Sequence, residues 1–310
     1  MTALRRWLDG FFFAPVDARS VGWMRASLGL LLVLRHLAIW PELEALFGPD
    51  ALLTSAPGAQ ATVIEGLALY RMVGDATALH ALHAALLVPL LAMTVGLGGR
   101  AGVLLALGVQ VALMHSNLSM TTAGGRLLRM WTLYMLTVPC AAQVSVDAWL
   151  RRRRGRPSAR VVPAFATRLV QIQLCWVYLA TGIVKASGGS WHRGEAVYRT
   201  LLAEHIQRFA GVPDPLWLAN GLPYAATQLA TWSTMGWELL FPALVCWRRT
   251  RWLALGFGVA LHLGIGVTTL VGLFSLITLW GYQAFLPGAQ PQGAPAGEPE
   301  PVPAKPGAAG

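Results

Sequence analysis

The stretch RLVQIQLCWVYLATGIVKASGGSW, residues 168–191, decides the fold class because it is an apolar run long enough to cross a membrane. Residues that recur every three or four positions share one face of a helix. Five residues of the stretch recur in this way: Gln171, Cys175, Tyr178, Gly182 and Lys185. The sequence therefore predicts a membrane-spanning helix with one polar face.

The lysine in this helix is a candidate functional residue. A lysine at mid-depth in a bilayer costs roughly 2.5–3.5 kcal/mol, and less where it reaches an interface. Only two lysines occur in the chain, Lys185 and Lys305, so Lys185 is not one of many. We expect its face to turn toward other helices or a wet cavity. There, desolvation favours the neutral amine, which can act as a base or a nucleophile.

The composition is that of an integral membrane protein. Of the 310 residues, 55% are hydrophobic and 12% are charged, and the mean hydropathy is +0.53. The formal net charge is +10, but the arginines form short blocks between apolar segments, where topology signals belong. We therefore expect the lipid bilayer as a partner and no nucleic acid. The sequence names no protein partner.

The apolar segments predict an all-α fold, a polytopic transmembrane helical bundle of seven or eight spans. Six spans are expected at about 21–40, 77–97, 101–118, 125–143, 168–191 and 225–246. The run 252–286 is too long for one ordinary span. It is either a span plus a re-entrant segment or a span plus a short second span, broken near Gly264, Gly266 or Gly272.

Three regions follow from this pattern. Residues 1–20 have a basic start and read as an interfacial amphipathic segment. Residues 21–286 form the transmembrane domain, within which the amphipathic part of 191–224 is expected to lie along the membrane surface. Residues 287–310 are rich in Pro, Gly and Ala, a composition typical of a disordered tail.

The arginines also predict an orientation. If the N-terminus is cytoplasmic, fourteen arginines fall in or beside cytoplasmic loops and four in outer loops. This asymmetry satisfies the positive-inside rule. It places Lys185 toward the outer side of its span. Scarce lysine beside abundant Arg, Ala and Gly favours a bacterial protein, so we expect a multi-pass protein of the bacterial inner membrane.

Other predicted spans contribute polar groups. Thr227, Thr231, Thr234 and Glu238 form a second helical stripe that ends in a carboxylate. Further candidates are His262, His115, Arg126 and Arg129. Each has a structural alternative: Glu238 can neutralise Lys185 as an interhelical ion pair, and His262 can be a hydrogen-bonded core histidine. The arginines, and Arg25 in the first span, can reach the lipid headgroups.

No metal site or familiar catalytic motif is predicted. Cys140, Cys175 and Cys246 form no CxxC, and the His80/His83 pair has no third ligand nearby in sequence. The chain contains no GxSxG, no P-loop, no HExxH and no GxGxxG after a strand.

Four segments resemble the horizontally transferred transmembrane domain (HTTM) family, whose best-known relatives are the vitamin K-dependent gamma-carboxylases. They are APVDARSVGWMRASLGLLLVLRHL (14–37), MHSNLSMTTAGGRLLRMWTLYMLTVP (114–139), QIQLCWVYLATGIVKASGGSWHRGEAVY (171–198) and WELLFPALVCWRRTRWLALGFGVALHLGIGVTTLVGLFS (237–275). The third is the most specific, because it is similar to the family's pattern of Tyr, Ala-Gly-x-x-Lys, Trp and Gly. The likeness spans most of residues 14–286.

The resemblance implies a role for Lys185. In the carboxylases, the matching lysine is the base that deprotonates reduced vitamin K, so the likeness implies a catalytic base with His262 and Glu238 as neighbours. Two departures are visible: Arg126 stands where the family often has an aspartate, and the predicted tail stands where the carboxylases continue into a large lumenal domain. We therefore do not expect carboxylation of a peptide glutamate.

Two hypotheses remain open. The first is a membrane enzyme that uses Lys185, with His262 and Glu238, on a lipophilic quinol-type substrate, a reduced quinone being the candidate cofactor. Its expected substrate-binding residues are Tyr178, Trp191, His115, Arg126 and Arg129. The second is a non-catalytic membrane component for partner binding, maturation or export, in which Lys185 and Glu238 form an interhelical tie. A transporter is a third possibility, although no inverted repeat is apparent.

Overall fold

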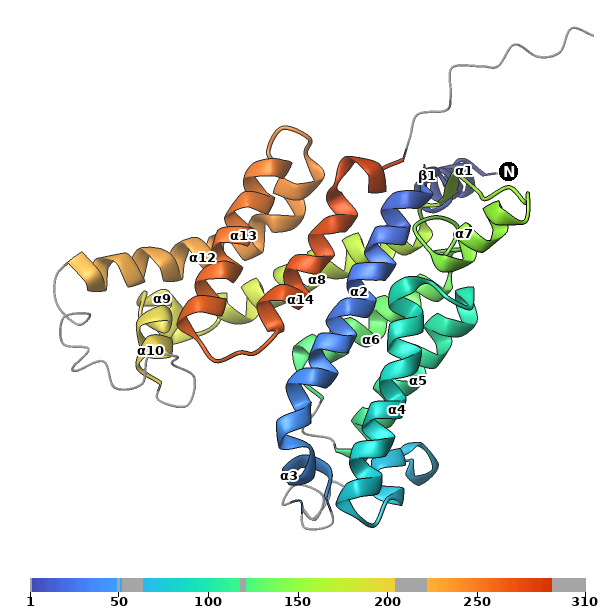
Figure 1. Ribbon diagram of the computed structural model, residues 1–310. Coiled ribbons are helices and arrows are strands. Elements are labelled where there is room, and N and C mark those ends of the chain that lie inside the picture. Colours follow the sequence, from blue (N-terminus) through green and yellow to red (C-terminus); the bar gives the residue numbers. More distant parts are fainter. Residues whose placement is uncertain (1, 49–50, 52–63, 118–120, 204–221, 292–310) are drawn as a thin grey trace, which may run out of the picture.

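The computed structural model describes residues 2–48, 51, 64–117, 121–203 and 222–291, and it is built almost entirely of helices (Figure 1). The α-helices are α1 (Ala3–Phe12), α2 (Ala18–Ile39), α3 (Leu43–Phe47), α4 (Ala76–Val95), α5 (Gly99–Ser116), α6 (Ala123–Leu136), α7 (Val146–Arg153), α8 (Phe165–Ala186), α9 (Gly189–His192), α10 (Ala196–Leu202), α12 (Leu222–Cys246), α13 (Arg251–Thr268) and α14 (Phe274–Trp280). Short 3₁₀ helices are η1 (Trp40–Glu42), η3 (Glu65–Leu67), η4 (Leu69–Met72), η6 (Gly281–Phe285) and η7 (Pro287–Ala289). Two strands are β1 (Pro15–Asp17) and β2 (Val161–Pro163).

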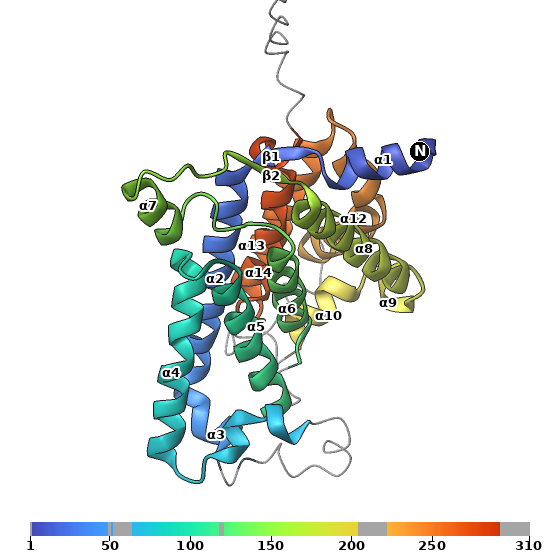
Figure 2. The ribbon, with the colours of Figure 1, turned by 90° about the vertical axis from the view of Figure 1, so that its right-hand side faces the viewer.

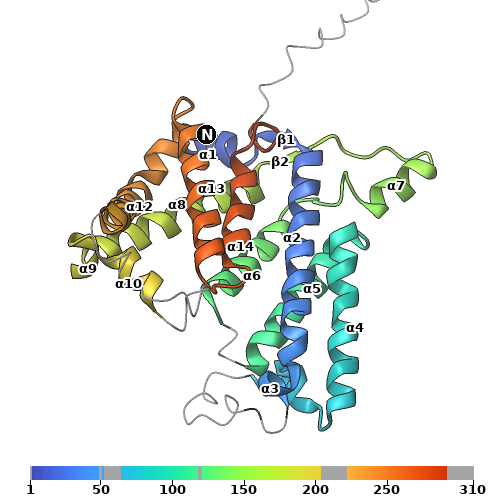
Figure 3. The same ribbon diagram turned by 60° about the vertical axis from the view of Figure 1, so that its left-hand side comes forward.

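Helices that follow one another in the chain pack together in two groups. In the first group α2 packs on α4, α4 on α5, and α5 on α6. In the second group α8 packs on α12, α12 on α13, and α13 on α14. Helix α6 contacts both α8 and α14, and α14 also contacts α2, so the groups share one continuous hydrophobic core. Figure 3 shows α13 and α14 side by side, with α2 next to α14.

Four described helices are long and apolar enough to cross a membrane: α4, α5, α8 and α13. Large apolar side chains point away from the protein on these helices, among them Leu105, Trp176 and Leu253. A broad apolar surface of this kind is stable against lipid and would be costly in water. The chain is therefore a helical membrane protein. The seven or eight spans expected from the sequence stay a prediction beyond these four helices.

The long apolar run 252–286 divides into two helices. Helix α13 ends at Thr268, and α14 starts at Phe274 and packs back against α13. Gly272 lies in the connection with a φ of +57°, a conformation that suits glycine because it has no side chain. The break is therefore confirmed as a long helix followed by a short second helix, and whether the short helix is re-entrant or a second span stays a prediction.

The expected span at 125–143 is wrong in length. Helix α6 ends at Leu136, and Pro139 lies in the turns that follow. A proline lacks the amide hydrogen that helix continuation needs. Arginines bind the carbonyl groups of this non-helical segment instead: Arg151 donates to the Ala141 carbonyl at 2.7 Å, and Arg25 donates to the Val144 carbonyl.

A two-stranded ribbon is a feature that the all-α prediction missed. Strands β1 and β2 pair antiparallel, with Val16 opposite Val162. Both valines are buried, and the ribbon joins the start of α2 to the segment before α8. Three-residue strands leave no alternating pattern long enough to read from a sequence.

The two ends of the molecule differ. Helix α1, α7 and the ribbon lie at one end, and α3 lies at the other (Figure 2). Helix α1 is amphipathic and has no buried residue. At the end of the described chain, η7 packs near α2 and Ala289 is buried, while residues 292–310 of the expected tail lie outside the described residues. Residues 204–221, most of the 191–224 region that contains the expected surface segment, lie outside them as well.

Candidate functional site

A cavity of about 510 Å³ lies between α6, α8, α10, α12, α13 and α14. Its wall combines apolar and polar side chains. The apolar contribution includes Leu127, Val177, Leu261, Ile265 and Phe274. The polar contribution includes Arg126, Gln173, Tyr178, Lys185, Glu238, His262 and several threonines. A largely apolar pocket with a few polar groups that face it is the usual form of a small-molecule site.

The close contact of α8 and α12 forms one wall of the cavity. Gly182 lies against the Leu239 backbone, and a Cβ atom added at Gly182 would lie 2.9 Å from the Leu239 nitrogen. Glycine at this point lets the two helix backbones approach each other, as small residues do in membrane bundles. The approach brings the next turn of α8, with Lys185, beside Glu238 of α12.

Lys185 and Glu238 form an ion pair in the cavity wall. The Lys185 ammonium group donates a hydrogen bond to Glu238 Oε1. Glu238 is buried, and its second oxygen, Oε2, has no hydrogen-bond partner among the described residues. The Lys185 nitrogen also lies 4.8 Å from the centre of the Trp191 ring, within cation–π range. The pair thus leaves one buried carboxylate oxygen available to a further donor.

A second polar group is a chain of three hydrogen-bonded side chains. The Tyr178 hydroxyl lies 2.7 Å from His262 Nε2 and 2.8 Å from the Tyr282 hydroxyl. His262 is buried, and its Nδ1 atom has no partner among the described residues. If Tyr178 donates to His262, then Nδ1 carries the proton, whereas if His262 donates to Tyr178, then Nδ1 is an acceptor. The chain can therefore offer the cavity either a donor or an acceptor.

The outer edge of the cavity is formed by α9 and α10. Glu195, at the start of α10, pairs with Arg193 at 3.1 Å and with Arg199 at 2.9 Å. Hydrogen bonds from these two arginines hold the pKa of the partly exposed Glu195 carboxyl below its ordinary value. These ion pairs stabilise the turn between α9 and α10. Val197, Thr200 and Leu201 of α10 line the cavity.

Six of the eight residues expected to act in catalysis or substrate binding line this cavity. They are Lys185, Glu238, His262, Tyr178, Trp191 and Arg126. His115 and Arg129 are not among the lining residues. His115 lies at the end of α5, where its Nδ1 accepts a hydrogen bond from the Ile64 amide at 3.2 Å. Arg129 lies one turn after Arg126, and its Nη1 has no hydrogen-bond partner within the described parts of the chain.

Sequence reasoning missed two residues of the site. Tyr282 lies in the apolar run 252–286, and only the packing of η6 against α8 brings it to Tyr178. Gln173 lines the cavity with an unpartnered Oε1 atom, although it lies outside the polar stripe of α8. No group of three or more His, Cys, Asp or Glu side chains that could hold a metal occurs in the described ranges.

A helical membrane protein with a polar site between its helices is the class that this fold and cavity define. The chain belongs to the HTTM domain family, whose family model matches residues 64–288. The matched range contains every residue of the cavity. No curated protein and no solved structure matches the chain.

Proposed function

We propose that this protein binds a lipophilic hydroxyl-bearing ring compound of the quinol type in the cavity, and that Lys185 removes the hydroxyl proton. The observation that carries the proposal is the Lys185–Glu238 pair in the wall of a largely apolar cavity. An apolar wall suits the ring and tail of such a compound. An amine at that wall suits its acidic hydroxyl.

The pair gives Lys185 a way to act as a base. In the proposed step, the ammonium group passes a proton to the Glu238 carboxylate across their hydrogen bond. The neutral amine then accepts the hydroxyl proton, the O–H bond breaks, and its electron pair stays on the quinol oxygen. The new ammonium group stabilises the anion that it has just produced.

The His262 chain supports the other side of the ring. With its proton on Nδ1, His262 donates to a second oxygen of the bound compound, and Tyr178 and Tyr282 fix that tautomer through their hydroxyl groups. Trp191 and Phe274 offer aromatic faces at the same cavity. The resemblance to vitamin K-dependent gamma-carboxylases, in which a matching lysine deprotonates a reduced quinone, supports this assignment.

The test is oxygen uptake by the purified, lipid-reconstituted protein with a panel of reduced naphthoquinones, because a quinolate reacts with dioxygen faster than a neutral quinol does. We expect uptake by the wild type and a loss of at least about 100-fold in Lys185→Met, the size of a general-base contribution. Lys185→Arg should lose uptake equally, because a guanidinium group keeps the positive charge and does not release its proton.

Stability measurements separate a lost base from a lost fold. Lys185→Met leaves the Glu238 carboxylate buried and unpaired, which costs about 3–5 kcal/mol, and adding Glu238→Gln should restore most of that loss. The double variant and Lys185→Arg should therefore fold and still be inactive. Normal uptake by either variant would contradict the proposal.

The direct ion pair also favours a second candidate, a non-catalytic membrane component in which Lys185 and Glu238 tie α8 to α12. This candidate predicts no oxygen uptake by the wild type with any quinol tested. Both candidates make the same stability predictions for Lys185→Met and Lys185→Arg, so oxygen uptake decides between them. A stable wild type that takes up no oxygen with any quinol tested would replace the enzyme with a structural or partner-binding protein.

A further inference from the structure

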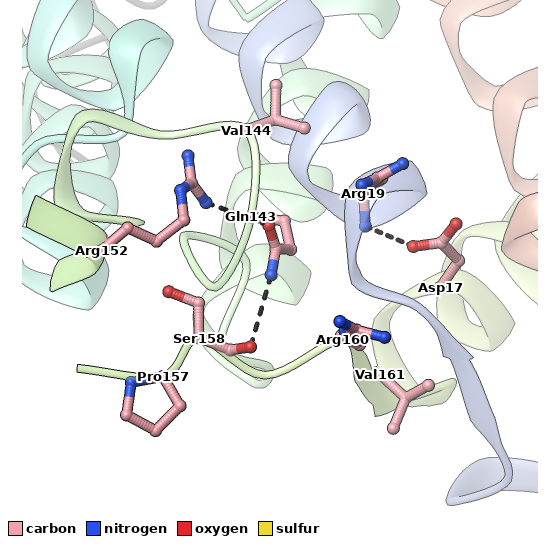
Figure 4. A pocket seen from close by; sticks show the side chains of 9 residues that line it. All are labelled: Asp17, Arg19, Gln143, Val144, Arg152, Pro157, Ser158, Arg160 and Val161. Carbon is pink, nitrogen blue, oxygen red and sulfur yellow. Dashed lines mark hydrogen bonds between the residues drawn. The ribbon is translucent and has the colours of Figure 1, made fainter. Parts of the chain in front are cut away.

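A second cleft, of about 950 Å³, lies at the end of the molecule that carries α1, α7 and the ribbon (Figures 2 and 4). It shares no residue with the cavity around Lys185. Its lining residues are Asp17, Arg19, Gln143, Val144, Arg152, Pro157, Ser158, Arg160 and Val161. Three of these nine are arginines, and they come from three separate segments of the chain.

Local contacts hold these segments together. The ribbon pairs Asp17 with Val161, and the Ala18 amide donates to the Arg160 carbonyl at 2.9 Å, so Arg19 and Arg160 are held on neighbouring segments. Gln143 connects the segment of Arg160 to α7, which carries Arg152. The Gln143 Nε2 donates to the Ala159 carbonyl at 3.0 Å, and its Oε1 accepts from Arg152 at 3.3 Å. Figure 4 shows Arg152 on one side of Gln143, and Arg19 and Arg160 on the other.

The cleft carries excess positive charge. Asp17 is its single acidic lining residue, and one oxygen of that carboxylate already accepts the Arg19 amide at 2.8 Å as the N-cap of α2. None of the three arginines forms an ion pair with a described residue, and all three are exposed. Three arginines therefore line the cleft, with one partly used carboxylate to balance them.

The surroundings of the cleft are those of a membrane interface. Helix α1 exposes Leu4 and Trp7, and α7 exposes Trp149. Tryptophan and amphipathic helices are enriched at the depth of the lipid headgroups. The arginine-rich segment 151–160, which includes Arg152 and Arg160, belongs to the same end. The cleft therefore lies at the depth of the lipid headgroups.

We propose that the cleft binds the phosphodiester headgroup of an anionic phospholipid. A guanidinium group can donate two parallel hydrogen bonds to two oxygens of one phosphate group. It therefore suits this anion better than an ammonium group does. Basic pockets beside membrane helices on the cytoplasmic side hold such headgroups. A bound lipid would bridge β1, α7 and β2, and so fix the end of the bundle to the inner leaflet.

The test compares two variants of equal charge. Arg19→Gln/Arg152→Gln/Arg160→Gln empties the cleft of guanidinium groups. Arg153→Gln/Arg154→Gln/Arg156→Gln removes three exposed arginines that do not line it. Each full-length protein is placed in nanodiscs of mixed phosphatidylglycerol and phosphatidylcholine, and the retained lipids are counted by native mass spectrometry after release.

The wild type should retain phosphatidylglycerol in preference to phosphatidylcholine. The cleft variant should lose on the order of 100-fold in that binding, since each basic residue near an anionic headgroup contributes about fivefold. The control variant should stay within a few-fold of the wild type. Equal losses in both variants would show diffuse surface attraction and overturn the proposal.

Two further measurements keep the result clear. Inorganic phosphate added in excess should leave phosphatidylglycerol in place, whereas its displacement would assign the cleft to a free phosphate and overturn the lipid assignment. Thermal unfolding in lipid-free detergent should be the same for all three proteins. If the cleft variant unfolds at a lower temperature, Arg160→Gln alone should still lose about fivefold in phosphatidylglycerol binding, and no loss would overturn the proposal.

Discussion

At the scale of single residues, the buried arginine of α2 explains how the membrane domain tolerates a charge in its core. Arg25 is fully buried, and it donates to the carbonyl groups of Met93, Thr94 and Val144. These carbonyl groups lie where α4 ends and where the turns after α6 pass. Arg25 therefore has the internal role rather than the headgroup contact, because its buried guanidinium group binds backbone carbonyl groups inside the bundle.

We expect Arg25→Met to destabilise the protein by about 3 kcal/mol, because it removes the side-chain donor from the partly buried carbonyl groups of Thr94 and Val144. Unfolding in detergent at increasing denaturant gives this free energy. Arg154→Met is the matched control, since Arg154 is exposed, and it should change the stability by less than about 0.5 kcal/mol. Equal effects of the two substitutions would contradict the capping role of Arg25.

The sequence identified single residues better than their contacts. Lys185, Glu238 and His262 stood out because ionisable groups are rare in apolar spans. The hydrogen bonds of Tyr178 to His262 and Tyr282 were not predicted, because these residues are 84 and 104 positions away from it. Such distances along the chain leave no local pattern, so the hydrogen-bonded chain became visible only in three dimensions.

At the scale of helices, the geometry of the candidate site depends on how closely α8 approaches α12. Gly182 sets that approach, because the Leu239 backbone occupies the space where a side chain would begin. Tyr178 packs edge-on against Trp237 of α12, with 4.6 Å between the ring centres. The contacts on both sides of Gly182 therefore fix the register in which Lys185 meets Glu238.

Gly182→Ala should separate the two helices by a few tenths of an ångström or more and destabilise the protein by about 1–3 kcal/mol. Gly236→Ala is the control on the neighbouring helix, since a Cβ atom there would meet nothing within 4 Å. The control should be neutral or slightly stabilising, because alanine favours helix. Thermal unfolding of both variants measures the difference, and equal stability would show that the helices are not in close contact.

Helix positions were predicted better than helix ends. The starts and ends of α2, α4, α5, α8 and α12 lie within a few residues of the expected spans, because long apolar runs have a clear helical interpretation. The end of α6 was missed because hydropathy does not detect Pro139, which follows it in an equally apolar segment. The break near Gly272 was among the expected alternatives, but hydropathy alone did not favour a second helix.

At the scale of the whole molecule, the arginine-rich segments gather at one end, with α1 and the ribbon (Figure 2). This arrangement supports our proposal that this end faces the cytoplasm of a bacterial cell. Family membership and a helical membrane fold were predictable, since both depend on composition and on motifs. The cleft was not, because it needs three segments that only the ribbon and Gln143 bring together.

Orientation can be tested with two single cysteines in a variant that lacks Cys140, Cys175 and Cys246. A membrane-impermeant maleimide should label Gly74→Cys in intact spheroplasts, and it should label Arg154→Cys only after the membrane is opened. Both positions are exposed, so a difference in labelling reports the side of the membrane. The opposite pattern would reverse the proposed orientation and move the arginine cleft to the outer leaflet.

The pairing of Val16 with Val162 has a consequence for how the protein is made. A ribosome releases the N-terminal strand early, but its partner emerges only when about half of the 310 residues have been synthesised. During this interval α2, α4 and α5 can enter the membrane and pack, because their contacts involve nearby parts of the chain. The arginine-lined end cannot close until β2 arrives. Nascent chains that stop before residue 161 should therefore hold a packed first group of helices, with the end that carries β1 still open.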